Sequence, residues 1–317
     1  MTPYLSLDLA YPDVYFDMIK NGELKIRVNA ARNLFEDIDT FNAIRSRAEA
    51  EGEGMYRIPF MKQFIDGTPA NFTGMLLEDY SDNPGERGKA TIDLDKMASA
   101  IETATENNVS VRLHSCGDRS CREALNAYEN ALKKFPETES RHMVEHLEVV
   151  DPADIPRFGQ LGVICSIQPE HLAAGTMKWT ENCYPEKLGP VREKFTWPFK
   201  KLRDGGAVLA GGTDCPVVDG NLFWGMYVGN TRTYYDGMPE GGWNPQEDLP
   251  MEDMIDMFTS GAAYAEHREN ELGTLEAGRL ADITVSDRNL LKLAGDTAIR
   301  DTQVLLTMVD GRIVYEK

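Results

Sequence analysis

Several features that would place a protein in a membrane or on a nucleic acid are missing from this sequence. Its 317 residues contain no run of about 18 apolar residues, so no transmembrane helix is expected. Positive charge is scarce, because 33 lysines and arginines stand against 52 aspartates and glutamates, a net charge of −19. An acidic surface of this size repels phosphate groups, which disfavours nucleic acids and anionic membranes as partners.

Cysteine and glycine motifs are equally sparse. The five cysteines are odd in number and form no C-x-x-C pair, which indicates reduced thiols and argues against a disulfide framework. No G-x-G-x-x-G or Walker pattern occurs, so a phosphate-binding loop is not expected. The first residues have neither the basic start nor the apolar stretch of a signal peptide, and the protein is predicted to be cytoplasmic.

Strand-like and helix-like patterns alternate along most of the chain. Short β-branched or apolar runs predict strands at 4–9, 24–31, 57–65, 109–113, 141–146, 162–168 and 207–212. Helices are predicted at 37–51, 94–107, 119–134, 191–203 and 251–266, and a long loop at 216–249. Alternation of this kind is typical of parallel strands joined by crossover helices, so the predicted fold class is α/β.

The pattern changes near residue 268. Strand patterns cover 272–285 and 304–315, and Asp310-Gly311 between two alternating runs is a strong hairpin signal. We therefore expect an α/β domain over residues 1–267 and a small, sandwich-like β module over residues 268–317.

Side chains that bind metals follow the predicted strands. Four of them stand at C-terminal strand ends, where parallel barrels expose their chemistry: Lys62, His114, His146 and Asp214. Imidazole and carboxylate groups are ligands of Zn²⁺ and similar ions. A single strand-end histidine is as often structural as functional. Two histidines one βα unit apart, together with an aspartate, favour a metal site at which the strands converge.

Six segments resemble, in the same order, the motifs of the YtcJ-like metal-dependent amidohydrolases (amidohydrolase family 3). They are KQFIDG (62–67), HSCGDR (114–119), RHMVEH (141–146), SIQPEH (166–171), LGPVR (188–192) and GTDCP (212–216). The tail LGTLEAGRLAD (272–282) also resembles the return of this family from its barrel to a β-sandwich. The resemblance extends from about residue 24 to the end of the chain.

The resemblance implies a TIM-type (β/α) barrel with one or two divalent metal ions, Zn²⁺ or another. These ions would activate water against a carbon–nitrogen bond of a non-peptide amide, imide or urea-like small molecule. By position in the motifs, Lys62 would be a bridging ligand, carboxylated on its amine, and His114 and His146 would bind the more exposed ion. Asp214 would bind the deeper ion and act as the general base.

Further positions follow from the same motifs. Three residues are expected beside the substrate: Gln168, His171 and Arg192. Three others are expected to brace the ligands from behind: Asp66, Asp118 and Arg119. Glu145, next to His146, is expected on the other face of its strand in a structural role.

One family motif is missing from the sequence. Members carry a His-x-His pair on the first barrel strand, whereas no two of the five histidines here are two positions apart. The barrel is therefore expected to be incomplete, with residues 1–267 supplying strands two or three to eight. Three explanations stay open: a truncated chain, a partner or second copy that completes the barrel, or an inactive relative. A metal-dependent isomerase or lyase on the same scaffold is a further alternative.

Overall fold

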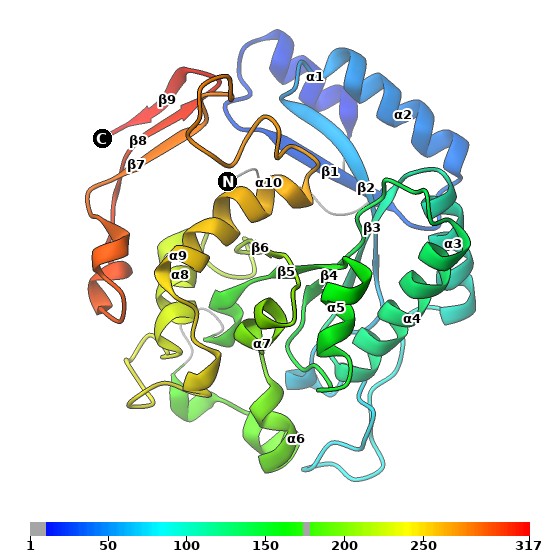
Figure 1. Ribbon diagram of the computed structural model, residues 1–317, viewed down its shortest axis with the longest axis vertical. Helices are drawn as coiled ribbons and strands as arrows, with labels where there is room; N and C mark the ends of the chain where they lie inside the picture. The colour runs from blue at the N-terminus through cyan, green and yellow to red at the C-terminus, as the bar shows by residue number, and fades with distance from the viewer. Residues whose placement is uncertain (1–10, 174–177) are drawn as a thin grey trace.

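The computed structural model describes residues 11–173 and 178–317 (Figure 1). Its centre is a parallel sheet of six strands that lie side by side in chain order. They are β1 (Val28–Asn33), β2 (Tyr56–Phe64), β3 (Ser110–Ser115), β4 (Met143–His146), β5 (Ile164–Ile167) and β6 (Leu209–Gly211). The α/β class and these six strands confirm the sequence prediction, while the strand expected at 4–9 lies outside the described residues.

The six-stranded sheet is open at both edges. Within residues 11–173 and 178–317, β1 pairs only with β2 and β6 only with β5. A closed TIM barrel, and a second chain that would complete it, therefore stay predictions.

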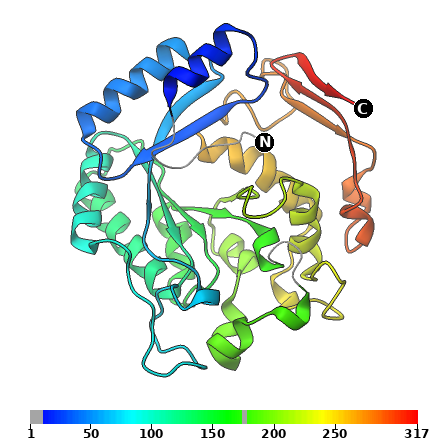
Figure 2. The ribbon, with the colours of Figure 1, turned by 180° about the vertical axis from the view of Figure 1, so that it is seen from behind.

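Helices cover the outer face of the sheet. Figures 1 and 2 show α2 (Ile38–Glu51), α3 (Leu94–Glu106), α4 (Asp118–Lys134) and α5 (Ile155–Leu161) outside strands β1 to β4. Two of these helices begin at an aspartate whose carboxylate accepts a free backbone N–H: Asp37 from Thr40, and Asp93 from Lys96. A shorter helix, α1 (Pro12–Lys20), precedes β1.

Three predicted segments differ from the structure. The helix expected at 191–203 is instead α6 (Tyr184–Arg192) and α7 (Phe199–Asp204), because Pro198 cannot supply a backbone N–H inside a helix. The helix at 251–266 is α9 (Met251–Asp256) and α10 (Ala262–Ala265), joined by one π-helical turn. The long loop expected at 216–249 contains α8 (Leu222–Thr231).

A second, antiparallel sheet forms the small C-terminal module. Its strands are β7 (Ile283–Ser286), β8 (Val304–Val309) and β9 (Arg312–Glu316), and the predicted hairpin at Asp310-Gly311 is confirmed. Both turn residues have positive φ, 50° and 76°, as a tight hairpin requires. Of the strand predicted at 272–285, only the end is a strand. Arg27, which precedes β1, ties the two sheets together with a bidentate ion pair to Asp282, the Nε–Oδ2 distance being 2.6 Å.

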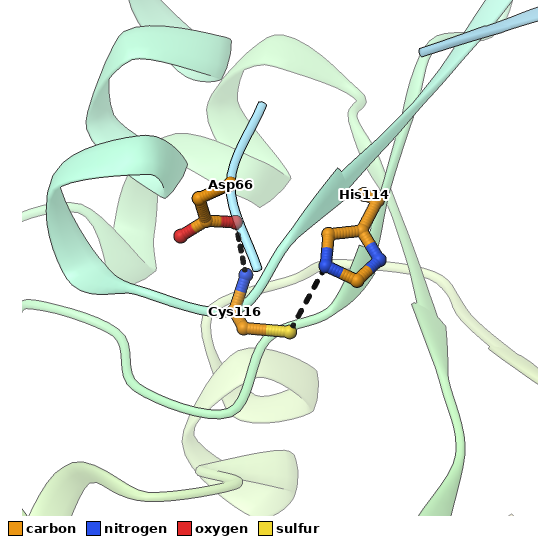
Figure 3. Close-up of side chains that lie close together, drawn as sticks. All are labelled: Asp66, His114 and Cys116. Atoms are coloured by element: carbon orange, nitrogen blue, oxygen red, sulfur yellow. Dashed lines mark hydrogen bonds between the residues drawn. The ribbon is translucent and has the colours of Figure 1, made fainter. Parts of the chain in front are cut away.

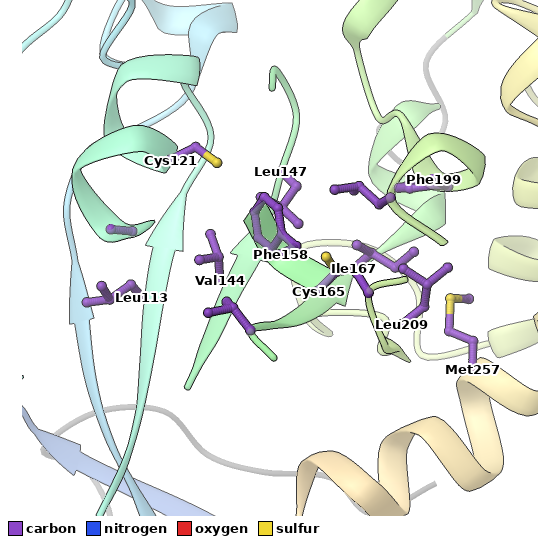
Figure 4. Packing of buried hydrophobic residues seen from close by; sticks show 14 of the residues in the cluster. Leu113, Cys121, Val144, Leu147, Phe158, Cys165, Ile167, Phe199, Leu209 and Met257 are labelled. Atoms are coloured by element: carbon purple, nitrogen blue, oxygen red, sulfur yellow. The ribbon is translucent and has the colours of Figure 1, made fainter. Parts of the chain in front are cut away.

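Alternation along the strands divides the core into two faces. On the outer face, Leu113, Val144 and Ile167 pack against helices, including Phe158 of α5, which has no exposed surface (Figure 4). On the inner face, an apolar layer lies nearest the N-terminal ends of the strands: Phe60, Met143, Ile164 and Ala210. Polar side chains follow toward the C-terminal ends, so this layer is the floor of the site described below.

No helix in the described ranges is both long and apolar enough to cross a bilayer. All five cysteines are free thiols, as predicted from their number and spacing.

Buried His142 gives the fold a specific sensitivity to acid. Its Nδ1 accepts the Val111 backbone N–H at 3.2 Å, and its ring stacks on Tyr128. Burial lowers the pKa of His142 from 6.5 to about 3. Between these values the unfolded chain binds a proton that the folded chain does not, so the free energy of unfolding decreases as the pH falls from 6.5 toward 3.

We expect His142→Gln to be less stable than the parent chain at pH 7 but to lose less stability on acidification. The difference in slope should be on the order of 1 kcal/mol per pH unit between pH 6 and 4. Urea unfolding at a series of pH values measures it. Identical pH dependence of the two chains would show that His142 does not titrate in this way.

Candidate active site

A cavity of about 400 Å³ lies at the C-terminal ends of the central strands. The strand register explains why predicted residues meet there, since Ser115 pairs with His146 and Phe64 pairs with His114. Adjacent parallel strands thus deliver their last side chains to one place. The cavity lining includes every predicted metal ligand and one residue predicted to bind substrate: Lys62, His114, His146, Asp214 and His171.

Three imidazoles and one carboxylate form a continuous row in this cavity. The ring centroids of His114 and His146 are 4.3 Å apart, and those of His146 and His171 are 5.5 Å apart. His171 Nε2 lies 3.6 Å from Asp214 Oδ2. One donor atom from each of His146, His171 and Asp214 lies within 4.8 Å of the other two. The sequence did not predict that His171 belongs to this group, because its motif indicated only a place beside the substrate.

Two residues of this group have unusual backbone conformations. His146 has φ 74° and Asp214 has φ 60°, in the left-handed region that most residues avoid. Such conformations cost about 1–3 kcal/mol each and persist where the surrounding structure holds them, which is commonly at functional sites. The backbone is therefore strained at two of the four positions whose side chains point metal-binding atoms into the cavity.

The histidines are held as neutral imidazoles. Burial lowers the pKa of His114 and of His171 to about 4, and it lowers the pKa of His146 well below its ordinary value. Among the described residues, His114 Nδ1, His146 Nδ1 and His171 Nε2 are buried without a hydrogen-bond partner. A buried nitrogen without a partner is costly unless a ligand satisfies it. Neutral, unsatisfied imidazoles are the form that binds a divalent metal ion.

Lys62 and Glu145 form a buried ion pair, which Arg112 extends. Lys62 Nζ is bonded to Glu145 Oε2, and Arg112 Nε lies 2.9 Å from Glu145 Oε1. Burial alone would raise the pKa of Glu145, but Lys62 and then Arg112 outweigh it and hold that pKa well below its usual range. The prediction that Glu145 points to the other face is wrong. Because the backbone turns at His146, both neighbouring side chains reach the inner side of the sheet.

The predicted carboxylation of Lys62 stays a prediction. In the structure the Lys62 amine donates to the Glu145 carboxylate. A carboxylated Lys62 would also place a second negative charge beside Glu145, with Arg112 as the nearest compensating cation.

Asp66 holds the turn after β3 behind His114 (Figure 3). Its carboxylate accepts the backbone N–H groups of Met75, Cys116 and Gly117 and the Ser120 hydroxyl, at 2.7 to 3.1 Å. Burial raises the pKa of Asp66 to about 6 despite these bonds. Cys116 Sγ lies 3.4 Å from His114 Nε2. With its oxygens already occupied by four donors, Asp66 positions the turn and is poorly placed to act as a ligand.

Four other predicted residues lie outside the cavity lining. Gln168 is buried next to Gly212, and Asp118 accepts the Leu77 backbone N–H at 2.9 Å. Arg119 lies beside Glu123 on the half-exposed side of α4.

Arg192 in particular does not line this cavity. Its guanidinium donates to the backbone carbonyls of Leu188, Glu78 and Asp79, so it holds the 77–87 loop against α6. Its donors are thus used within the chain, and we do not retain it as a binding residue.

Glu148 is a cavity residue that the sequence did not reveal. It follows His146 by two residues, is 5% exposed, and accepts the Tyr184 hydroxyl at 2.5 Å. Burial raises the pKa of Glu148 to about 7, although the bond from Tyr184 opposes this effect. Its position just after a strand end carries no motif, so only the folded arrangement brings it to the cavity.

The sequence model of the Amidohydrolase family matches residues 4–315. The chain is 31% identical over 264 residues to the putative amidohydrolase YtcJ of Bacillus subtilis, covering 81% of this chain and 47% of that protein. It is 29% identical over 315 residues to the protein LONG AFTER FAR-RED 3 of Arabidopsis thaliana, covering 96% and 51%. An N-substituted formamide deformylase of Arthrobacter pascens is 27% identical over 215 residues, covering 68% and 38%.

Among solved structures, an uncharacterized metal-dependent hydrolase from Pyrococcus furiosus matches with a TM-score of 0.71 and 26% identity. The match covers 90% of this chain and 56% of that one. An uncharacterized metal-dependent hydrolase from Pyrococcus horikoshii gives a TM-score of 0.75 at 23% identity, over 92% of this chain and 56% of that one. The chain thus spans about half the length of YtcJ, of LONG AFTER FAR-RED 3 and of the two Pyrococcus structures.

Proposed function

Since the chain belongs to the amidohydrolase family, we propose that it is part of a metal-dependent hydrolase that cleaves a carbon–nitrogen bond of an amide-type small molecule. One observation carries this proposal. Three unprotonated imidazoles with unsatisfied nitrogens and one carboxylate converge on a single cavity: His114, His146, His171 and Asp214.

The donor set suits Zn²⁺ or another divalent cation. Neutral histidines with a carboxylate are a common ligand combination for catalytic zinc, which keeps one position open for substrate or water. His146, His171 and Asp214 would hold the ion, and His114 stands next to them for the same ion or a second one. When bound, such an ion supplies Lewis acidity that polarises a carbonyl group and makes water more acidic.

We assign the proton transfers to Asp214. Its carboxylate lies at the cavity mouth, where 42% of the side chain is exposed, and it faces His171. From there it can accept a proton from attacking water and pass it to the leaving nitrogen. The Lys62–Glu145–Arg112 cluster adds buried ion pairs next to these groups, with Lys62 in the cavity lining.

The cavity and the relatives support the proposed substrate class. The lining is mainly apolar, with a few polar groups near the strand ends, as in many small-molecule sites. Because one relative is an N-substituted formamide deformylase, N-benzylformamide is a suitable first substrate, alongside a cyclic imide and a dipeptide.

Metal removal tests the proposal. We expect the zinc-loaded chain to hydrolyse at least one member of this panel, to lose at least 90% of the rate after chelation, and to regain it with added Zn²⁺ or Co²⁺. Product analysis separates hydrolysis from isomerisation or elimination on the same scaffold. Turnover that is unaffected by chelation would contradict the proposed function. So would a chain that turns over no substrate of the panel with any metal.

A further inference from the structure

Among the residues that the structure describes, Glu148 lines the cavity with no lysine or arginine within ion-pair distance, and its hydrogen-bond donor is the Tyr184 hydroxyl. Lys62 is the only lysine or arginine in the lining, and it is engaged by Glu145. The groups that act on Glu148 are a hydroxyl, a thiol and another carboxylate: Tyr184, Cys116 and Asp66. The residues that the structure does not describe, 1–10 and 174–177, contain no lysine, arginine or histidine. A carboxyl group is thus enclosed in a pocket wall without a basic side chain to balance it.

The surroundings of Glu148 are those of a site for an organic cation. Tyr184, which donates its hydroxyl to Glu148, also lines the cavity with its ring, and Tyr234 and Phe64 add two more aromatic rings. Aromatic faces and a carboxylate together favour an ammonium group, through the ring quadrupoles and a charge-assisted hydrogen bond. The net charge of −19 also raises the concentration of small cations near the surface.

Glu148 lies close to the candidate metal ligands. Cys116 alone bridges the two groups, since its thiol contacts Glu148 and its Sγ lies 3.4 Å from His114 Nε2. A ligand with its scissile bond at the histidines would therefore reach Glu148 with a group only a few bonds away. The apolar remainder of the wall would cover its hydrocarbon part.

We infer that Glu148 is a specificity residue that selects substrates carrying a basic amino group near the bond to be cleaved. The part of this inference that concerns bond cleavage rests on the proposed function, whereas the binding of an ammonium group at Glu148 does not. Burying a carboxyl group in an apolar wall is costly, and an ammonium group in the ligand offsets this cost where an alcohol or a methyl group does not.

Binding of matched probes tests the inference without turnover. Hexylammonium and hexan-1-ol have the same length, and calorimetry on the zinc-loaded chain measures both. We expect the parent chain to bind hexylammonium at least tenfold more tightly, Glu148→Gln to lose this preference, and Glu148→Asp to keep most of it. Glu186→Gln removes the same charge from an exposed position on α6 and should leave the preference intact.

Turnover gives a second comparison. The ratio of kcat/KM for N-(4-aminobutyl)formamide to that for N-(4-hydroxybutyl)formamide should fall at least tenfold in Glu148→Gln. Equal binding of the two probes by the parent chain would overturn the inference, and so would an unchanged preference in folded Glu148→Gln. If Glu148→Gln does not fold, the probe preferences of the parent chain and of Glu148→Asp test the inference. A chain that prefers hexylammonium but hydrolyses nothing would refute the proposed function and support the inference.

Discussion

Asp214→Asn is expected to lower kcat/KM for the best amide substrate by about 100-fold or more, which is a typical loss when a general base is removed. The amide keeps the shape of the side chain but cannot accept the proton from water. Folding should be retained, because asparagine tolerates the left-handed backbone that position 214 adopts, φ 60°. Steady-state kinetics with metal content measured on the same sample make the comparison.

A neighbouring substitution provides the control for Asp214→Asn. Asp219 lies in the same segment, is exposed and is outside the cavity lining, so Asp219→Asn removes an equal charge without touching the site. It should retain the parent rate within about threefold. If both variants kept nearly full activity, Asp214 would not be the base.

Glu145→Gln is expected to destabilise the fold by about 3–5 kcal/mol, because it leaves two buried cations without their shared carboxylate. Lys62, Arg112 and Glu145 are each less than 5% exposed, so water cannot replace the lost charge. Chemical denaturation at pH 7 measures the loss. The effect should exceed that of any substitution on the surface of the molecule.

A surface ion pair offers a matched comparison. Glu102 contacts Lys134 at 2.5 Å, but water reaches both side chains, which are 36% and 57% exposed. Glu102→Gln should therefore cost less than about 1 kcal/mol. Similar losses for the two glutamine variants would mean that the inner cluster contributes no more to stability than an exposed pair does.

The sequence predicted the strands and their terminal side chains well, for a physical reason. Strands buried on both faces are short apolar runs, and a polar residue that ends such a run must be near a loop or a site. Lys62, His114, His146 and Asp214 stand out in this way, and the structure brings all four to one cavity. The motif order that identified the family also suggested the proposed reaction type, which strand patterns alone do not contain.

Other features depend on contacts that no local pattern records. Helix α8 is apolar on all sides and contains Gly225 and Gly229, so its sequence has no amphipathic period to indicate a helix. Glu145 lies on the inner face two positions after Met143, as alternation requires, whereas the inward position of His146 depends on its left-handed backbone, which breaks the alternation that the prediction assumed. Glu148 lies in the cavity wall beside Tyr184, which is 36 positions further along the chain.

Metal stoichiometry tests most directly whether the histidine cluster is a cation site. After dialysis against Zn²⁺ and then against buffer, the parent chain should retain about one ion, and His146→Ala should retain less than about 0.1. His267→Asn, which changes a histidine bonded to Ser110 away from the cavity, should bind like the parent. A parent chain that retains no zinc, or a His146→Ala chain that retains as much as the parent, would contradict the assignment of this cavity as a metal-dependent active site.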